Sequence, residues 1–238
     1  NNCISVAIVD YSKLVPVPAD LVINGNPALI KRTCDTEDAT FMLGPDYFIM
    51  DQAYANLETS KPSGKVKKIL LTLGGSDHND LIFKTIKAIE SIDANLEVMV
   101  ITSNATGYLD RLSQFLQSSK LNSQLYADVP GLENYWGKVD VAVTAGGNTL
   151  FERVASRLPG ATVCQLSRQM KIADCFQRLG VNFNLGFGPQ RTEDELLDKM
   201  AQYLDDHELH NDQYSKSPDV VDGRGLIRIG NQINIMTD

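Results

Sequence analysis

Two glycine-rich turns carry the residue types best suited to bind an anionic ligand. One follows the apolar run Lys68–Leu73 and the other follows Val139–Thr144, and each precedes a segment with helical spacing of apolar residues. Glycine lets a ligand approach the backbone, and free N–H groups at a helix start favour phosphate. We therefore expect these turns to bind a nucleotide through Gly74, Gly75, Ser76 and Asp77, and through Gly146, Gly147, Asn148 and Thr149.

Structural alternatives exist for both turns. Paired glycines also make tight turns that bind nothing, and Asp77 suits the cap of the following helix. Glu152 lies one helical turn after the second turn, where a carboxylate can accept hydrogen bonds from two ribose hydroxyls. An acidic residue there also compensates the helix dipole. The presence of both turns in one domain favours the ligand-binding interpretation.

Histidines supply no clear catalytic group. His78 adjoins the first glycine turn and suits either a ligand contact or an exposed helix start. His207 and His210 lie in an acidic stretch, where we expect them to be solvated. The sequence lacks H-x-x-x-H, C-x-x-C and G-x-S-x-G patterns and a Walker-type lysine. We expect no metal and no cofactor, and the catalytic residues stay unknown.

Strands and helices alternate along most of the chain. Beyond the polar stretch Glu58–Lys65, buried strands at 68–73, 96–101, 123–126, 139–144 and 161–164 alternate with helical segments. The motif Thr192–Glu195 is a capping box that opens a helix through Leu204. Such repeated units predict an α/β fold with a Rossmann-type parallel sheet, whose ligands bind at strand carboxyl ends.

The beginning of the chain predicts part of another domain. The apolar run Cys3–Asp10 suits a buried parallel strand, which needs neighbours on both sides. Asp20–Asn24 is a second strand candidate. We expect either a fragment of a longer chain or neighbours supplied from elsewhere. The predicted division is a partial lobe at 1–60, a binding domain at 65–215 and a terminal helix at 216–238.

Composition restricts the partners. With 43% hydrophobic and 22% charged residues and a net charge of −8, the chain suits a globular domain without affinity for nucleic acid. It contains no apolar run of membrane-spanning length and no basic-then-apolar leader. The four cysteines form no paired motif. We expect a cytoplasmic protein with free thiols.

Six segments, in order and at sensible spacings, resemble a known family. They are Asp20–Asn24, Leu43–Tyr47, Leu71–Asp77 (with its GGSD turn), Asp140–Glu152, Gln169–Val181 and Asp222–Ile229. Together they resemble the nucleotide-sugar hydrolases of pseudaminic-acid biosynthesis and the spore-coat polysaccharide biosynthesis proteins. The Asp140–Glu152 stretch is also similar to the lipid-linked N-acetylglucosaminyltransferase of peptidoglycan synthesis. The resemblance spans nearly the whole chain and implies a GT-B-like fold, here with a partial N-terminal lobe.

The resemblance assigns roles to several residues. It implies that the turn beginning at Gly146 holds the diphosphate, that Glu152 holds the ribose, and that Gln169 lies near the sugar or phosphate. Two features depart from the family. A G-x-G-H-x-x-R turn, which carries the family's expected base, does not occur in the chain. In the loop Ser156–Gly160, the residue order differs from the Gly-x-Pro order that is usual in the family.

Two classes of function follow. The first is an enzyme, completed by an N-terminal lobe, that hydrolyses or transfers the sugar of a UDP-sugar in surface-polysaccharide or nonulosonic-acid biosynthesis. The second is a non-catalytic nucleotide-sugar-binding subunit or the half of a glycosyltransferase. In that case a second chain or dimer mate would complete the N-terminal lobe.

Overall fold

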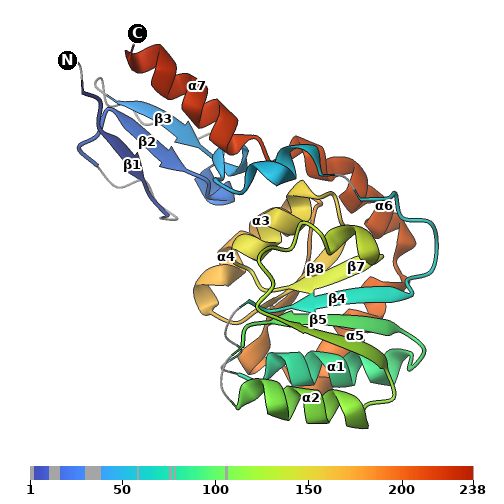
Figure 1. Ribbon diagram of the computed structural model, residues 1–238. Helices are drawn as coiled ribbons and strands as arrows, with labels where there is room; N and C mark the ends of the chain where they lie inside the picture. The colour runs from blue at the N-terminus through green and yellow to red at the C-terminus, as the bar shows by residue number, and fades with distance from the viewer. Residues whose placement is uncertain are drawn as a thin grey trace.

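The computed structural model describes residues 3–10, 17–29, 39–57, 59–74, 77, 79–104 and 107–237. These residues form two α/β bodies of unequal size (Figure 1). The larger one contains a six-stranded sheet and the smaller one a three-stranded sheet. The final helix, α7 (Gly225–Thr237), packs on the small sheet. The chain therefore leaves the small body and later returns to it.

The large sheet is parallel throughout and has the strand order β6-β5-β4-β7-β8-β9. Its strands are β4 (Lys68–Thr72), β5 (Glu97–Thr102), β6 (Asn122–Ala127), β7 (Val141–Thr144), β8 (Gly160–Cys164) and β9 (Phe183–Phe187). The order reverses between β4 and β7, so the topological switch point lies there. This arrangement confirms the predicted fold class.

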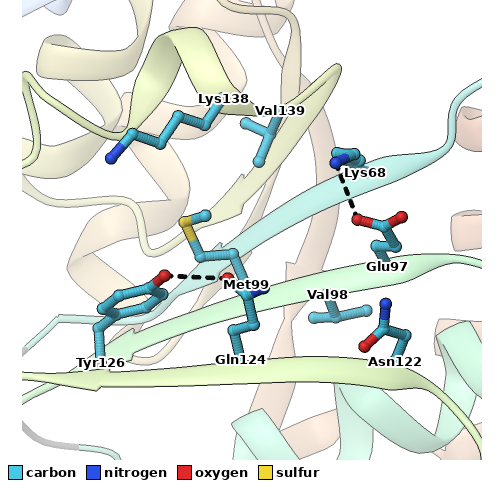
Figure 2. Close-up of a pocket in the computed structure, with 9 residues that line it drawn as sticks. All are labelled: Lys68, Glu97, Val98, Met99, Asn122, Gln124, Tyr126, Lys138 and Val139. Atoms are coloured by element: carbon cyan, nitrogen blue, oxygen red, sulfur yellow. Dashed lines mark hydrogen bonds and ion pairs between the residues drawn. The ribbon is translucent and has the colours of Figure 1, made fainter.

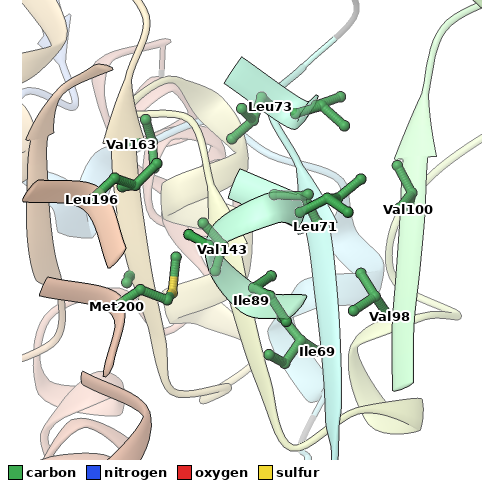
Figure 3. Close-up of a cluster of buried hydrophobic side chains, with 14 of the residues drawn as sticks. Ile69, Leu71, Leu73, Ile89, Val98, Val100, Val143, Val163, Leu196 and Met200 are labelled. Carbon is green, nitrogen blue, oxygen red and sulfur yellow. The ribbon is translucent and has the colours of Figure 1, made fainter. Parts of the chain in front are cut away.

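Helices cover both faces of the large sheet, as Figure 1 shows. One face packs against α1 (Leu81–Ile92), α2 (Tyr108–Ser118) and α5 (Glu193–Asp205). The opposite face packs against α3 (Asn148–Ala155) and α4 (Ser167–Arg178). Figure 3 shows how side chains of the first face interlock, among them Ile69, Leu71, Val143 and Met200, all nearly inaccessible to solvent. The predicted capping box is present, since the Thr192 and Glu195 side chains each accept a hydrogen bond from the other's backbone N–H.

The small sheet consists of β1 (Val6–Ile8), β2 (Leu21–Asn24) and β3 (Thr40–Leu43), all parallel, with β2 in the centre. All four residues of β2 are buried. β1 instead lies at the edge, where Ile8 is 68% exposed. The predicted parallel strand is therefore present, but it stays partly exposed because, within the described chain, β1 pairs with β2 alone.

Two segments connect the bodies. The first runs from the 3-10 helix η2 (Pro45–Tyr47) through η3 (Gln52–Asn56) towards β4. The second follows α6 (His207–Lys216) and η6 (Ser217–Asp219) and leads into α7. The Phe48 ring of the first segment stacks on Phe151 of α3, with ring centroids 3.8 Å apart. This contact joins the small body to the helix that follows the second glycine turn.

His210 corrects the expectation of solvated histidines. It lies on α6, is 1% exposed, and its Nε2 is 2.9 Å from the backbone oxygen of Tyr203. Burial lowers the pKa of His210 below its ordinary value. The reordered loop at Ser156–Gly160 is also unusual, because Arg157 adopts a positive φ of 60°. The guanidinium of Arg157 lies over the Tyr214 ring at 4.1 Å.

Candidate functional site

The two glycine turns come together at the switch point of the large sheet. They follow β4 and β7, which are hydrogen-bonded neighbours with Thr72 paired to Thr144. The Ala145 N–H donates to the Thr72 backbone oxygen at 3.2 Å just before the second turn. Ligands of open α/β sheets bind outside strand carboxyl ends at this position. The strand order thus places both turns where a ligand is expected.

Gly146 and Gly147 meet different surroundings. A Cβ at Gly146 would lie 2.9 Å from Gln169 Cβ and 3.3 Å from Cys164 Sγ, so α4 packs directly on this glycine. A Cβ at Gly147 would have only Gln169 Nε2 nearby, at 3.8 Å. Gly147 has φ −102° and ψ −150°, which side chains tolerate. Packing therefore explains Gly146, whereas Gly147 faces open space.

Gln169 lies at the start of α4, beside the Gly147 turn. Its Oε1 accepts hydrogen bonds from the backbone N–H groups of Gln165, at 2.8 Å, and Leu166, at 3.2 Å. These two bonds fix the orientation of the amide, because only its oxygen can accept. The Nε2 donor consequently faces the Gly147 turn. The side chain that the family resemblance singled out thus caps the start of α4 and directs its N–H donors to the turn that precedes α3.

Glu152 is half-buried on α3, one turn beyond Asn148 and on the same face of the helix. Burial raises the pKa of Glu152, and the negative charge of Glu133 raises it further. Within the described part of the chain, no donor contacts the Glu152 carboxylate. Its oxygens can therefore accept hydrogen bonds from a ligand that extends along α3. Thr149 lies in the first turn of the same helix and is half-buried.

The first glycine turn contributes less to the described site. Gly74 has φ +87°, and a Cβ there would meet no atom within 4 Å. The Asp77 carboxylate accepts hydrogen bonds from the N–H groups of Leu81 and Ile82, at 2.9 and 2.7 Å, and from the Tyr108 hydroxyl at 2.9 Å. The two backbone bonds cap the start of α1, and the third joins Asp77 to α2. The predicted Gly75 and Ser76, together with His78, lie outside the described residues.

A cavity of about 570 Å³ lies between the two bodies and contains the second glycine turn. From the large body it is lined by Gly146, Gly147, Asn148, Phe151, Arg168, Gln169, Lys171 and Ile172. The small body contributes Ile8, Val9, Asp10, Ile23, Gly25, Asn26, Tyr47, Phe48 and Ile49. Four of the predicted residues therefore line one cavity, whereas Gly74, Asp77, Thr149 and Glu152 do not line it. The sequence analysis missed Arg168 and Lys171, although both lie within two positions of Gln169.

A second cavity, of about 390 Å³, lies at the opposite ends of the strands. Lys68, Glu97 and Asn122, the first residues of β4, β5 and β6, border it. Figure 2 shows Lys68 paired with Glu97, at 2.9 Å, and the Tyr126 hydroxyl bonded to Gln124. Four of its polar side chains are thus paired with one another, and it lies away from the strand ends that carry the glycine turns.

The described residues form neither a metal-binding cluster nor a membrane-spanning helix. Among the residues that the structure describes, no three histidine, cysteine, aspartate or glutamate side chains are grouped so that they could hold a metal ion. In the same residues, no helix has the length and apolar character needed to cross a membrane.

The chain matches no protein-family model. Its sequence is 26% identical over 217 residues to the spore coat polysaccharide biosynthesis protein SpsG of Bacillus subtilis (strain 168), covering 89% of this chain and 63% of that protein. It is 24% identical over 166 residues to the uncharacterized protein MJ1062 of Methanocaldococcus jannaschii, covering 66% of this chain and 34% of that protein. The chain thus spans less than two thirds of the length of these curated relatives.

Solved structures resemble the whole described architecture. MurG of Acinetobacter baumannii superposes with a TM-score of 0.63 and 13% identity, over 91% of this chain and 60% of that one. The glycosyltransferase of kitacinnamycin superposes with a TM-score of 0.60 and 18% identity, over 91% of this chain and 54% of that one. The spinosyn rhamnosyltransferase SpnG, solved with thymidine diphosphate, superposes with a TM-score of 0.55 and 14% identity, over 91% of this chain and 57% of that one. At these identities the likeness concerns the fold. The chain has the α/β fold of the GT-B glycosyltransferases over somewhat more than half of their length.

Proposed function

We propose that this chain binds a UDP-sugar in the cavity between its two bodies and acts in the biosynthesis of a surface polysaccharide or a nonulosonic acid. The observation that carries the proposal is the arrangement along α3. The open Gly147 turn faces the cavity, and the unpaired Glu152 carboxylate follows one turn later on the same helix face. Backbone N–H groups at the helix start suit the diphosphate, and Glu152 suits the ribose hydroxyls.

The sequence relatives support a role in sugar metabolism. SpsG is a spore coat polysaccharide biosynthesis protein by name, and it matches 89% of this chain. A structural neighbour of the same fold, SpnG, was solved with a nucleoside diphosphate. The choice of uridine and of a hydrolase or a transferase is our proposal.

We further propose that catalysis needs an N-terminal lobe more complete than the part described. In hydrolysis or transfer the bond between the anomeric carbon and the diphosphate oxygen breaks, and UDP leaves with the electron pair. A general base must then activate water or an acceptor hydroxyl, which contributes about 10²–10⁴-fold. His207 and His210 lie on α6, outside the cavity. We place the base in lobe residues that a longer chain, a second chain or a dimer mate would supply.

A non-catalytic nucleotide-sugar-binding subunit is the second candidate. It would bind UDP-sugars in the same way but would release no UDP, even when the lobe is complete. An assay for UDP release from UDP-N-acetylated sugars separates the two functions.

Calorimetric titration tests the nucleotide site itself. We expect UDP to bind more tightly than ADP or GDP, and Glu152→Ala to weaken UDP binding by about 1–3 kcal/mol through lost charge-assisted hydrogen bonds. The same substitution should weaken 2′-deoxy-UDP binding less than UDP binding, because one of the two hydroxyls that donate to Glu152 is already missing. Equal losses for UDP and 2′-deoxy-UDP would remove Glu152 from the ribose site.

The pH dependence provides a second readout of the same carboxylate. Ribose hydroxyls donate to ionised Glu152, so UDP affinity should be constant above the raised pKa of Glu152 and fall as the pH drops through it. Glu133→Gln removes the neighbouring charge and should shift this fall to lower pH. An unshifted profile in Glu133→Gln would show that another group controls binding.

A further inference from the structure

Arg168 lies in the first turn of α4 and Lys171 at the start of the second, and both line the cavity from the same side as the Gly147 turn. Both side chains are exposed. Among the described residues, neither forms an ion pair or a hydrogen bond. The two cations are therefore available to a ligand in the cavity.

Their position is unfavourable for the helix itself. Positive charges at a helix N-terminus oppose the helix dipole, and like charges three residues apart repel each other. Arg168, in the first turn of α4, incurs the first penalty, and its pairing with Lys171 three residues later incurs the second. An anionic ligand in the cavity would reverse these penalties, because it would face two cations and the N–H groups of the same turn.

The neighbourhood of the glycine turn indicates which anion they would meet. Gln169 lies between the two cations in sequence, and its Nε2 is 3.8 Å from the Cβ position of Gly147. Glu152 extends from the turn in the other direction, along α3. Figure 1 shows α3 and α4 together on the side of the large body that faces the small sheet. A nucleotide with its ribose at Glu152 and its first phosphate at Gly147 would therefore direct its next phosphate towards α4.

We propose that Lys171 and Arg168 contact the distal phosphate of the bound nucleoside diphosphate, so that the site selects diphosphates over monophosphates. This inference rests on the proposed nucleotide site. It assigns the diphosphate specificity to two side chains that lie outside the glycine-rich turns. Arginine and lysine both bind phosphate, the first through a bidentate fork and the second as a point charge.

Asp10 offers a competing explanation, because it lines the opposite wall of the cavity. The two cations could pair with Asp10 when the bodies approach each other. The two explanations predict different effects of an Asp10 substitution on UDP affinity. Asp10→Asn removes a negative charge from a phosphate site and should leave UDP affinity unchanged or raise it. If the cations serve Asp10, the same substitution should weaken UDP binding as much as Lys171→Gln does.

The test is titration of the full chain with UDP and UMP at two salt concentrations. For the double variant Arg168→Gln with Lys171→Gln we expect UDP affinity to fall by about 10-fold or more and UMP affinity to change by less than about twofold. The salt dependence of UDP binding should also weaken, because fewer charges are neutralised. Lys171→Arg should retain UDP binding. Arg178→Gln, at the other end of α4, is the matched control and should bind as the unaltered protein does.

The outcomes separate the two proposals. If the unaltered chain binds no UDP, the nucleotide site itself is wrong. If it binds UDP but the double variant keeps the preference for UDP over UMP, the nucleotide site stands and the role of Lys171 and Arg168 is overturned. Equal losses for UDP and UMP would also overturn it, since a contact to the distal phosphate cannot affect UMP.

Discussion

At the residue scale, the two adjacent glycines of the second turn have separate physical causes. Gly146 is fixed by the close approach of α4, where any Cβ would press on Gln169. Gly147 has room for a side chain and an ordinary backbone conformation. Folding alone therefore explains the first glycine and does not explain the second. The space above Gly147 is the part of the cavity that a phosphate would occupy.

Substitutions at the two glycines should accordingly have different effects. We expect Gly147→Val to leave thermal stability nearly unchanged and to abolish UDP binding, because its methyl groups fill the space that the phosphate needs. Gly146→Ala should cost about 1–3 kcal/mol of stability through overpacking. Thermal unfolding and UDP titration of both variants are the measurements. Wild-type affinity in Gly147→Val would mean that the turn is only structural.

At the element scale, Arg153 holds the end of α3 to its neighbours. The side chain is 0% exposed, and its guanidinium donates to the Leu158 and Val181 backbone oxygens and to Asn182 Oδ1 at 2.9–3.0 Å. Burial lowers the pKa of Arg153 to about 10, so the group stays protonated at neutral pH. Gly160 leaves the room for it, since a Cβ there would lie 2.5 Å from Arg153 Cδ. This buried cation fixes the helix that carries Glu152.

Replacing Arg153 should therefore destabilise the large body. We expect Arg153→Met to lower the free energy of unfolding by about 3 kcal/mol, because the Leu158 and Val181 oxygens lose the Arg153 donor and Asn182 Oδ1 keeps only the Thr162 hydroxyl. Urea unfolding measures this loss. Lys87→Met is the control, since Lys87 forms an exposed ion pair with Glu193 whose removal should cost less than about 1 kcal/mol. A loss in Arg153→Met no larger than the control's would show that the buried contacts contribute little.

At the scale of the whole molecule, two glycines allow the two connecting segments to approach each other closely. A Cβ at Gly223 would lie 2.6 Å from the Tyr54 backbone, and one at Gly225 would lie 2.3 Å from the Phe48 oxygen. Phe48 in turn lines the cavity and stacks on Phe151. Arg228 of α7 adds an ion pair with Asp222 and a hydrogen bond to the Asp46 oxygen. The packing of α7 against this segment thus helps to position Phe48 in the wall of the proposed site.

A substitution at Gly225 should disturb the small body and leave the large one intact. For Gly225→Val we expect faster amide hydrogen exchange in β2 and α7, unchanged exchange in β4 and β7, and weaker UDP binding. Gly230→Ala is the matched control in the same helix, because its Cβ would meet no atom within 4 Å. It should stabilise α7 by about 0.5–1 kcal/mol. Faster exchange throughout the large sheet in Gly225→Val would contradict this division of the molecule.

The sequence by itself determined features that depend on neighbours along the chain. Apolar runs placed the strands β4, β5 and β7, and the alternation of strands and helices predicted the parallel sheet. The capping box at Thr192 and the position of the glycine turns after strands also followed from local spacing. These predictions succeeded because local periodicity and capping depend on residues a few positions apart.

Only the tertiary structure decided features that depend on distant partners. β9 escaped the sequence analysis because its five residues include Asn184 and Gly186 and so form no apolar run, and only its pairing with β8 makes it a strand. His210 lies in a polar segment, yet α6 packs it under Tyr203. Likewise, the sequence could not show that Arg168 and Lys171 face the same cavity as Gly147. Burial, register and the convergence of side chains arise from contacts between segments far apart in the chain, and no local pattern records them.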